Sequence, residues 1–133
     1  MRRIPGLLIG AVLIGTLGCG ERASPSTGDP AVAVGALYSV HDAKAGFRVA
    51  KVLVVDERAV HVRVYKNRFE ERPVTIDAAT LSLGTINDKD GFGMGHLPMT
   101  RSAFAAWEPV LLQRGSVEPA ELEGYEIWRS ANR

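Results

Sequence analysis

The stretch that most constrains the fold of this chain is residues 47–69, with the sequence FRVAKVLVVDERAVHVRVYKNRF. In its second half, Val60, Val62 and Val64 alternate with polar and aromatic residues. A period of two places the three valines on one face of a β-strand. We therefore expect a strand whose valine face packs on the core and whose other face, with His61, points outward.

The first half of this stretch predicts the partner strand. Residues 48–55 are apolar at both parities apart from Arg48 and Lys51, which suits a strand covered on both sides or one whose face switches at a bend. Residues 56–59 form a polar break of hairpin length. A helix is the alternative, but the seven valines between positions 49 and 64 lose rotamer freedom in a helix. We expect a β-hairpin.

Weaker patterns predict elements on either side of the hairpin. Apolar alternation and β-branched residues predict strands at 36–41, 74–76, 81–86 and 110–113. Capping and proline signals predict helices at 100–107 and 120–129, and a turn followed by a strand at 125–128 is the alternative for the second helix.

The order of residues across the hairpin carries a family resemblance. An aromatic residue, Arg, Ala, alternating valines, an acidic turn and further valines follow one another at Phe47, Arg48, Ala50, Val52, Val55, Asp56, Val60, Val62 and Val64. This pattern over residues 47–65 resembles the second and third strands of Tudor and related SH3-like small barrels. The resemblance implies a small SH3/Tudor-like barrel or a curled antiparallel sheet. The expected fold class is therefore mainly β (α+β), with short C-terminal helices.

The chain departs from the Tudor pattern where a ligand would bind. Tudor domains place aromatic and acidic residues after the third strand to cage methylated lysine or arginine. Here that place holds Lys66 and Arg68, whose charges repel a cationic ligand. A cage of aromatic residues is the alternative, but aromatic side chains that close the ends of a small barrel are more common. The residues concerned are Tyr38, Phe47, Tyr65 and Phe69.

The chain opens with a pattern typical of an export signal. Arg2 and Arg3 precede an uncharged, largely apolar run over residues 4–17. This run is shorter than the roughly 20 residues that a helix needs to cross a bilayer, so an uncleaved anchor is the less favoured alternative. We expect residues 1–18 to be a signal peptide.

Cys19, the only cysteine, follows this run. The segment 16–19 (TLGC) resembles the lipobox of bacterial lipoproteins, in which the cysteine is lipidated and becomes the new N-terminus after cleavage. Gly18 and Cys19 match the last two positions of the motif, whereas Thr16 stands where leucine is usual. The resemblance implies a lipid anchor on Cys19. An ordinary signal peptide with an incidental cysteine is the alternative.

Residues 19–35 are rich in Ser, Pro, Thr, Gly and Ala, and such a segment buries too little apolar surface to offset its ordering entropy. We expect a disordered tether there and a single small β-rich domain over residues 36–133, since 133 residues leave room for one domain. Without Arg2 and Arg3, 14 basic residues stand against 15 acidic ones. This balance does not favour binding to nucleic acid.

The glycine-rich loop at residues 87–96 is the best candidate for a ligand site. Its glycines let the backbone approach a ligand closely, and the side chains that could contact it are Asp88, Asp90, Phe92 and His96. The start of the loop is similar to half of a calcium-binding loop, but Met99 stands where a closing glutamate is required. No metal site is expected.

Motifs of the common enzyme classes are missing from the sequence. It contains no Gly-x-Ser-x-Gly, and its glycine-rich segment lacks the lysine of a phosphate-binding loop. We expect no catalytic residues and no cofactor, and we favour a non-enzymatic role.

These features predict a lipoprotein anchored in the cell membrane and facing the periplasm or the cell exterior. We expect it to bind an envelope protein. The alternatives are a ligand carrier or small enzyme with its site at the 87–96 loop, and a structural envelope protein.

Overall fold

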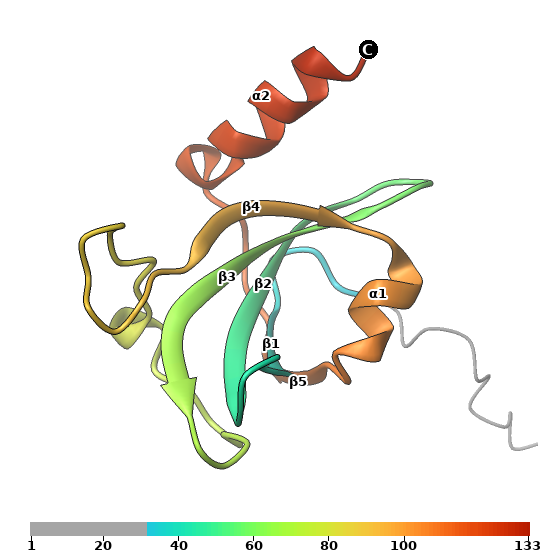
Figure 1. The fold of residues 1–133 in the computed structure, drawn as a ribbon. Coiled ribbons are helices and arrows are strands. Elements are labelled where there is room, and N and C mark those ends of the chain that lie inside the picture. The colour runs from blue at the N-terminus through green and yellow to red at the C-terminus, as the bar shows by residue number, and fades with distance from the viewer. Residues whose placement is uncertain (1–31) are drawn as a thin grey trace, which may run out of the picture.

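The computed structural model describes residues 32–133, which form one antiparallel sheet and two short α-helices (Figure 1). The predicted signal peptide, Cys19 and most of the predicted tether lie outside the described residues. The strands are β1 (Leu37–His41), β2 (Phe47–Val55), β3 (Val60–Phe69), β4 (Met94–Met99) and β5 (Val110–Gln113). The helices are α1 (Arg101–Ala106) and α2 (Glu123–Ala131), with 3₁₀ turns η1 (Ala78–Thr80) and η2 (Pro119–Leu122). None of the helices in this part of the chain is long and apolar enough to cross a membrane.

The strand order is β4-β3-β2-β1-β5, and every neighbouring pair is antiparallel. The sheet is strongly curled, and α1 connects the two edge strands, β4 and β5, on the open side of the curl (Figure 1). The sheet is not closed into a barrel. The expected mainly β fold is confirmed, and α2 is the short helix at the C-terminal end.

The predicted hairpin forms β2 and β3. Asp56 begins the turn, and its Oδ1 accepts hydrogen bonds from the backbone N–H groups of Arg58 and Ala59, both at 2.8 Å. The pairing register shifts twice along β2, between Arg48 and Ala50 and between Val52 and Val54. Such bulges bend a strand and increase its twist, which accounts for the curl.

The core lies inside this curl. The three alternating valines of β3 pack there with β1 and β2 residues and with Phe104 of α1; the residues buried beside them include Tyr38, Val40, Ala50 and Val52. Tyr38 and Phe104 meet edge to face, with ring centroids 5.9 Å apart. Residues on both faces of β2 are buried, including the adjacent Val52 and Leu53, so the expectation of a strand covered on both sides is confirmed.

The prediction of two short strands between β3 and β4 is wrong. Residues 74–76 and 81–86 form no strand, because only isolated backbone bonds tie the second segment to its neighbours, from Lys66 N to Ser82 O and from Gly93 N to Leu83 O. The fourth strand is instead β4, which the sequence pattern did not predict because Gly95 and Pro98 interrupt it. Pro98 is compatible with an edge strand, where an N–H group is not required on the outer side.

Both predicted helices form. The Thr100 hydroxyl caps α1 by accepting a hydrogen bond from the N–H of Ala103 at 3.1 Å, as its position predicted. Pro119 opens the η2 turn, which continues into α2. The alternative of a strand at 125–128 is wrong.

Candidate functional site

The two acidic residues predicted for the ligand site, Asp88 and Asp90, stabilise the loop that contains them. Lys66 Nζ lies 3.0 Å from Asp88 Oδ2 and 3.5 Å from Asp90 Oδ1. Asp88 also accepts hydrogen bonds from the backbone N–H and the hydroxyl of Thr85. These contacts, led by the Thr85 N–H, lower the pKa of Asp88. Both carboxylates therefore bind the loop to β3.

The other two predicted site residues lie on different faces of the sheet. His96 and Leu97 are neighbours on β4, so their side chains point to opposite faces. Leu97 and Phe92 line a groove on the core side, whereas His96 contacts His61 and α2 on the other side. The four predicted residues do not form one site.

The groove is a cavity of about 320 Å³ with a mainly apolar lining. We call it the Trp107 groove, and its principal lining residues are Arg48, Val64, Phe92, Met94, Leu97 and Trp107. A smaller cavity of about 130 Å³ adjoins it, since Arg48, Val64 and Trp107 line both. The volume lies at the lower end of the range of small-ligand pockets, roughly 300–1,000 Å³. One or two side chains of a ligand would fill it.

Arg48 is the charged group of the Trp107 groove. Its Nε and Nη2 donate to the carbonyl of Tyr65 at 3.0 and 2.8 Å, and Nη2 also donates to the carbonyl of Phe92 at 3.3 Å. Burial lowers the pKa of Arg48; the charge of Asp42 acts in the opposite direction, and that of Arg68 adds to the lowering. Arg48 thus fixes the position of Phe92.

The carboxylate whose charge acts on Arg48 is itself paired with another arginine. The Asp42 side chain is largely buried, and its Oδ2 lies 2.7 Å from Arg68 Nη1. Its Oδ2 makes no hydrogen bond of good geometry within residues 32–133, so the contact with Arg68 is ionic. Asp42 is thus paired with Arg68, whereas Arg48 forms no ion pair with a carboxylate within residues 32–133.

Backbone strain lies beside Trp107. Glu108 has φ 52°, the one positive φ at a non-glycine residue within 32–133. The Glu108 carboxylate contacts the ring atom Nε2 of His41 at 3.2 Å, and the backbone N–H of His41 donates to the Trp107 carbonyl at 2.9 Å. Residues held in such conformations concentrate at functional sites. These contacts fix Trp107 at the wall of the groove.

A second cluster lies on the opposite face of the sheet and joins Asp56, His61 and His96. His61 Nε2 lies 2.9 Å from Asp56 Oδ2, and His61 Nδ1 lies 3.0 Å from His96 Nε2. The two imidazole rings are stacked, with an angle of 10° between their planes. His61 was predicted to point outward. It does lie on the face opposite the valines, but its side chain is fully buried.

The helix α2 covers this cluster. Tyr125 and Trp128 contact the His61 ring edge to face, with centroids 4.8 and 4.7 Å away. Gly124 lies so close to His96 that a Cβ at position 124 would come within 2.7 Å of the His96 Cβ. At η2, Lys51 Nζ contacts Glu121 Oε1 at 2.9 Å. The sequence showed the spacing of Tyr125 and Trp128 on one face of a helix, but it did not show that these rings contact His61 on β3.

The cluster shifts the proton affinities of its members. The hydrogen bond from His61, supported by the N–H groups of Arg58 and Ala59, lowers the pKa of Asp56 to about 2. Burial lowers the pKa of His96, and the neighbouring His61 lowers it further. Asp56 is therefore charged and His96 favours its neutral form at neutral pH.

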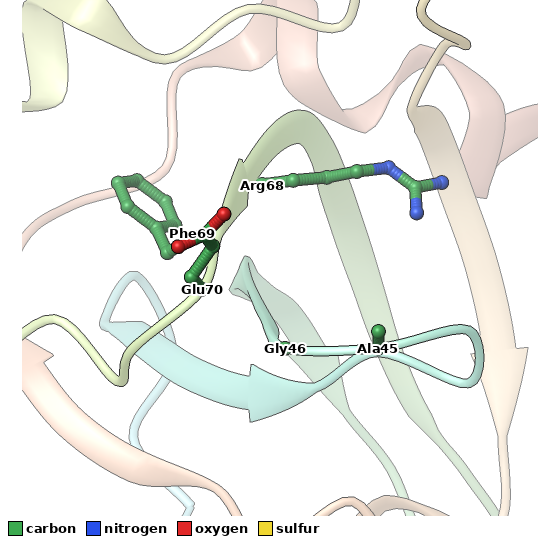
Figure 2. Close-up of a pocket in the computed structure, with 5 residues that line it drawn as sticks. All are labelled: Ala45, Gly46, Arg68, Phe69 and Glu70. Atoms are coloured by element: carbon green, nitrogen blue, oxygen red, sulfur yellow. The ribbon is translucent and has the colours of Figure 1, made fainter.

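A third hollow, of about 240 Å³, lies where the β1–β2 loop meets the end of β3 (Figure 2). In Figure 2 the Arg68 and Phe69 side chains point away from each other, and Gly46 and Ala45 offer only backbone and one methyl group. A Cβ on Gly46 would lie 2.3 Å from the Phe69 carbonyl oxygen, so the glycine permits this close approach. The hollow therefore results from the close packing of the β1–β2 loop against the end of β3.

Within residues 32–133, no group of three or more His, Cys, Asp or Glu side chains is arranged to hold a metal ion. No family model matches the chain, and neither the curated proteins nor the solved structures contain a match.

Proposed function

We propose that this protein is a membrane-anchored lipoprotein whose β-rich domain binds an envelope protein through the Trp107 groove. The observation that carries the proposal is the groove itself, an apolar cavity beside a partly buried arginine. Trp and Arg side chains in such positions dominate the binding energy of many protein interfaces. Phe92 and Met94, about half exposed, offer apolar surface at its rim.

The partner chemistry follows from the lining. An apolar side chain fits the cavity, and a carboxylate next to it could form a charge-assisted pair with Arg48. Within residues 32–133, Arg48 donates hydrogen bonds through Nε and Nη2 but not through Nη1. Since guanidinium groups bind carboxylates well, Nη1 is the atom that would contact a carboxylate of the partner. An apolar C-terminal residue of a partner chain combines both groups.

The location rests on the sequence. The basic start at Arg2 and Arg3, the short apolar run and the lipobox-like Cys19 support export and a lipid anchor. The expected tether ends before residue 32, because Val32 and Ala33 pack against the core and the Gly35 N–H donates to the Val52 carbonyl at 2.7 Å. A tether over residues 19–31 would let the domain reach a partner near the cell membrane, on the periplasmic or exterior side.

We further propose that the domain is an open relative of the SH3-like small barrels. The order β4-β3-β2-β1-β5, the bulged β2 and the short helix between the two edge strands support this assignment.

A peptide titration tests the groove. A tetrapeptide with a C-terminal leucine and a free carboxylate should bind with a dissociation constant of about 1 mM, as expected for so small a ligand. The same peptide with a C-terminal amide should bind at least about tenfold more weakly, because a charge-assisted bond is lost. Fluorescence of Trp107 in a Trp128→Phe background reports binding.

Variants assign the peptide to the groove. Met94→Glu places a negative charge at the exposed rim and should abolish binding, whereas Val74→Glu, at a residue 85% exposed and outside the groove, should not. Equal binding of acid and amide would refute the carboxylate. Binding that survives Met94→Glu would refute the groove. Binding of a free fatty acid in place of either peptide would favour the ligand-carrier alternative.

A further inference from the structure

The hydrogen bond between His61 and His96 sets a limit on the number of protons that the cluster can hold. It joins one ring nitrogen of each residue at 3.0 Å, so one nitrogen must carry a hydrogen and the other must be bare. Two neutral rings satisfy this condition, and so do one neutral and one cationic ring. Two imidazolium rings do not, because both facing nitrogens then carry hydrogens.

We propose that the Asp56–His61–His96 cluster is an acid-sensitive latch, which holds α2 on the sheet while at most one of the two histidines is protonated and releases it when both are. Tyr125 and Trp128 dock on the two rings, so a change in the ring pair acts directly on the docking surface of the helix. This latch is independent of the Trp107 groove, which lies on the other face of the sheet.

The groups around the histidine pair place a carboxylate beside one of the two rings only. On the turn before β3, the charged Asp56 lies against His61 and can compensate one imidazolium. On α2, Tyr125 and Trp128 present rings without a carboxylate to balance a second charge. At η2, Glu121 is already paired with Lys51 and lies 4.0 Å from Arg63. No described carboxylate is therefore left for His96.

The attachment of α2 is weak enough to respond. No residue of η2 or α2 is buried, and the Lys51–Glu121 pair is the main contact besides the aromatic rings. Burial alone raises the pKa of Glu121, but hydrogen bonds from Lys51 and from the Glu118 backbone outweigh it, and the pKa lies below its usual value. This pair therefore persists in mild acid, and the histidine contact is the part that changes.

The direction of the pH effect follows from His96. Its pKa is lower in the docked state than the ordinary value of 6.5, so the docked state binds protons less readily than the released state. Docking is fully favoured above pH 6.5 and weakens progressively as the pH falls below it.

Fluorine NMR of the full chain in detergent micelles, labelled with 5-fluorotryptophan, tests the latch. The chain contains two tryptophans, and Trp107 serves as the reference for the rest of the fold. Between pH 8 and pH 4.5, the Trp128 signal should move to the position of a solvent-exposed indole, while the Trp107 signal and the sheet circular dichroism persist. A Trp128 signal that does not move, or that moves only with loss of the sheet, would overturn the proposal.

Three variants complete the test. His96→Gln retains an N–H donor for His61 but cannot take a proton, so the Trp128 transition should disappear. Glu121→Gln weakens the second attachment and should shift the transition to higher pH. His41→Gln, at the one histidine outside the cluster, should leave it unchanged. A transition that persists in His96→Gln, or that vanishes in His41→Gln, would show that the Asp56–His61–His96 cluster does not cause it.

Discussion

Single residues on the covered face connect the local structure of α2 to that of the sheet. Gly124 interrupts a helix, where glycine is unfavourable, yet any larger residue there would collide with His96. Asp56 combines two functions, since one carboxylate oxygen closes the hairpin turn and the other binds His61. Both residues link the local structure of the chain to the packing of α2.

Gly124→Ala provides a test of this packing. In a free helix, alanine is better than glycine by about 1 kcal/mol. Here the added Cβ would lie 2.7 Å from the His96 Cβ, so we expect the Trp128 signal to shift toward its exposed position and the melting temperature to fall. Glu126→Ala, at an exposed position of the same helix, is the control. A rise in melting temperature for Gly124→Ala would contradict the close contact.

Asp56 determines a second pH effect, at lower pH than the latch. Its pKa falls from 3.8 to about 2 in the folded protein, so its contribution to stability is complete above about pH 4 and is lost as the pH falls toward 2. Urea unfolding at several pH values should show that Asp56→Asn is less stable than the natural protein at pH 6. The difference should shrink below pH 3. A constant difference over that range would contradict the assignment.

At the scale of elements, the sheet and α1 form the core, and α2 is an added cover. The buried hydrophobic residues come from β1, β2, β3 and α1, together with Ala36 and Ala59 beside them, whereas α2 contributes no buried residue. Its removal should leave the core intact.

Truncation after Val117 removes η2 and α2 and tests this division. We expect a loss of about 2–3 kcal/mol in the free energy of unfolding, because two aromatic side chains lose partial burial and one ion pair is lost. The β-sheet signal in circular dichroism should remain. Complete unfolding of the truncated chain would show that α2 belongs to the core.

The sequence predicted the elements that depend on local pattern. Alternating valines identified the hairpin, and Thr100 and Pro119 identified helix starts. Of the two expected architectures, a small barrel and a curled antiparallel sheet, the protein forms an open sheet. It did not predict β4, because Gly95 and Pro98 mask an edge strand that its partner β3 stabilises. It also did not pair His61 with His96, because 35 residues separate them and only the sheet register brings them together.

For the molecule as a whole, we propose that a lipid anchor on Cys19 holds a partner-binding domain at the membrane. The anchor makes its own prediction: protein extracted from membranes should lack residues 1–18 and carry diacylglyceryl and acyl groups on Cys19. Intact mass spectrometry measures both changes, and a Cys19→Ala variant should carry no lipid. A full-length unmodified mass in the soluble fraction would contradict the anchor.

Photo-crosslinking in intact cells from position 92, at the rim of the Trp107 groove, tests directly whether the groove binds an envelope protein. Phe92 is about half exposed, so benzoylphenylalanine can replace it without disturbing the core. We expect one dominant envelope-protein adduct from position 92, which is absent from a probe at position 74 and is lost with Met94→Glu. Equal adducts from both positions, or an adduct that survives Met94→Glu, would show that the groove is not the binding site.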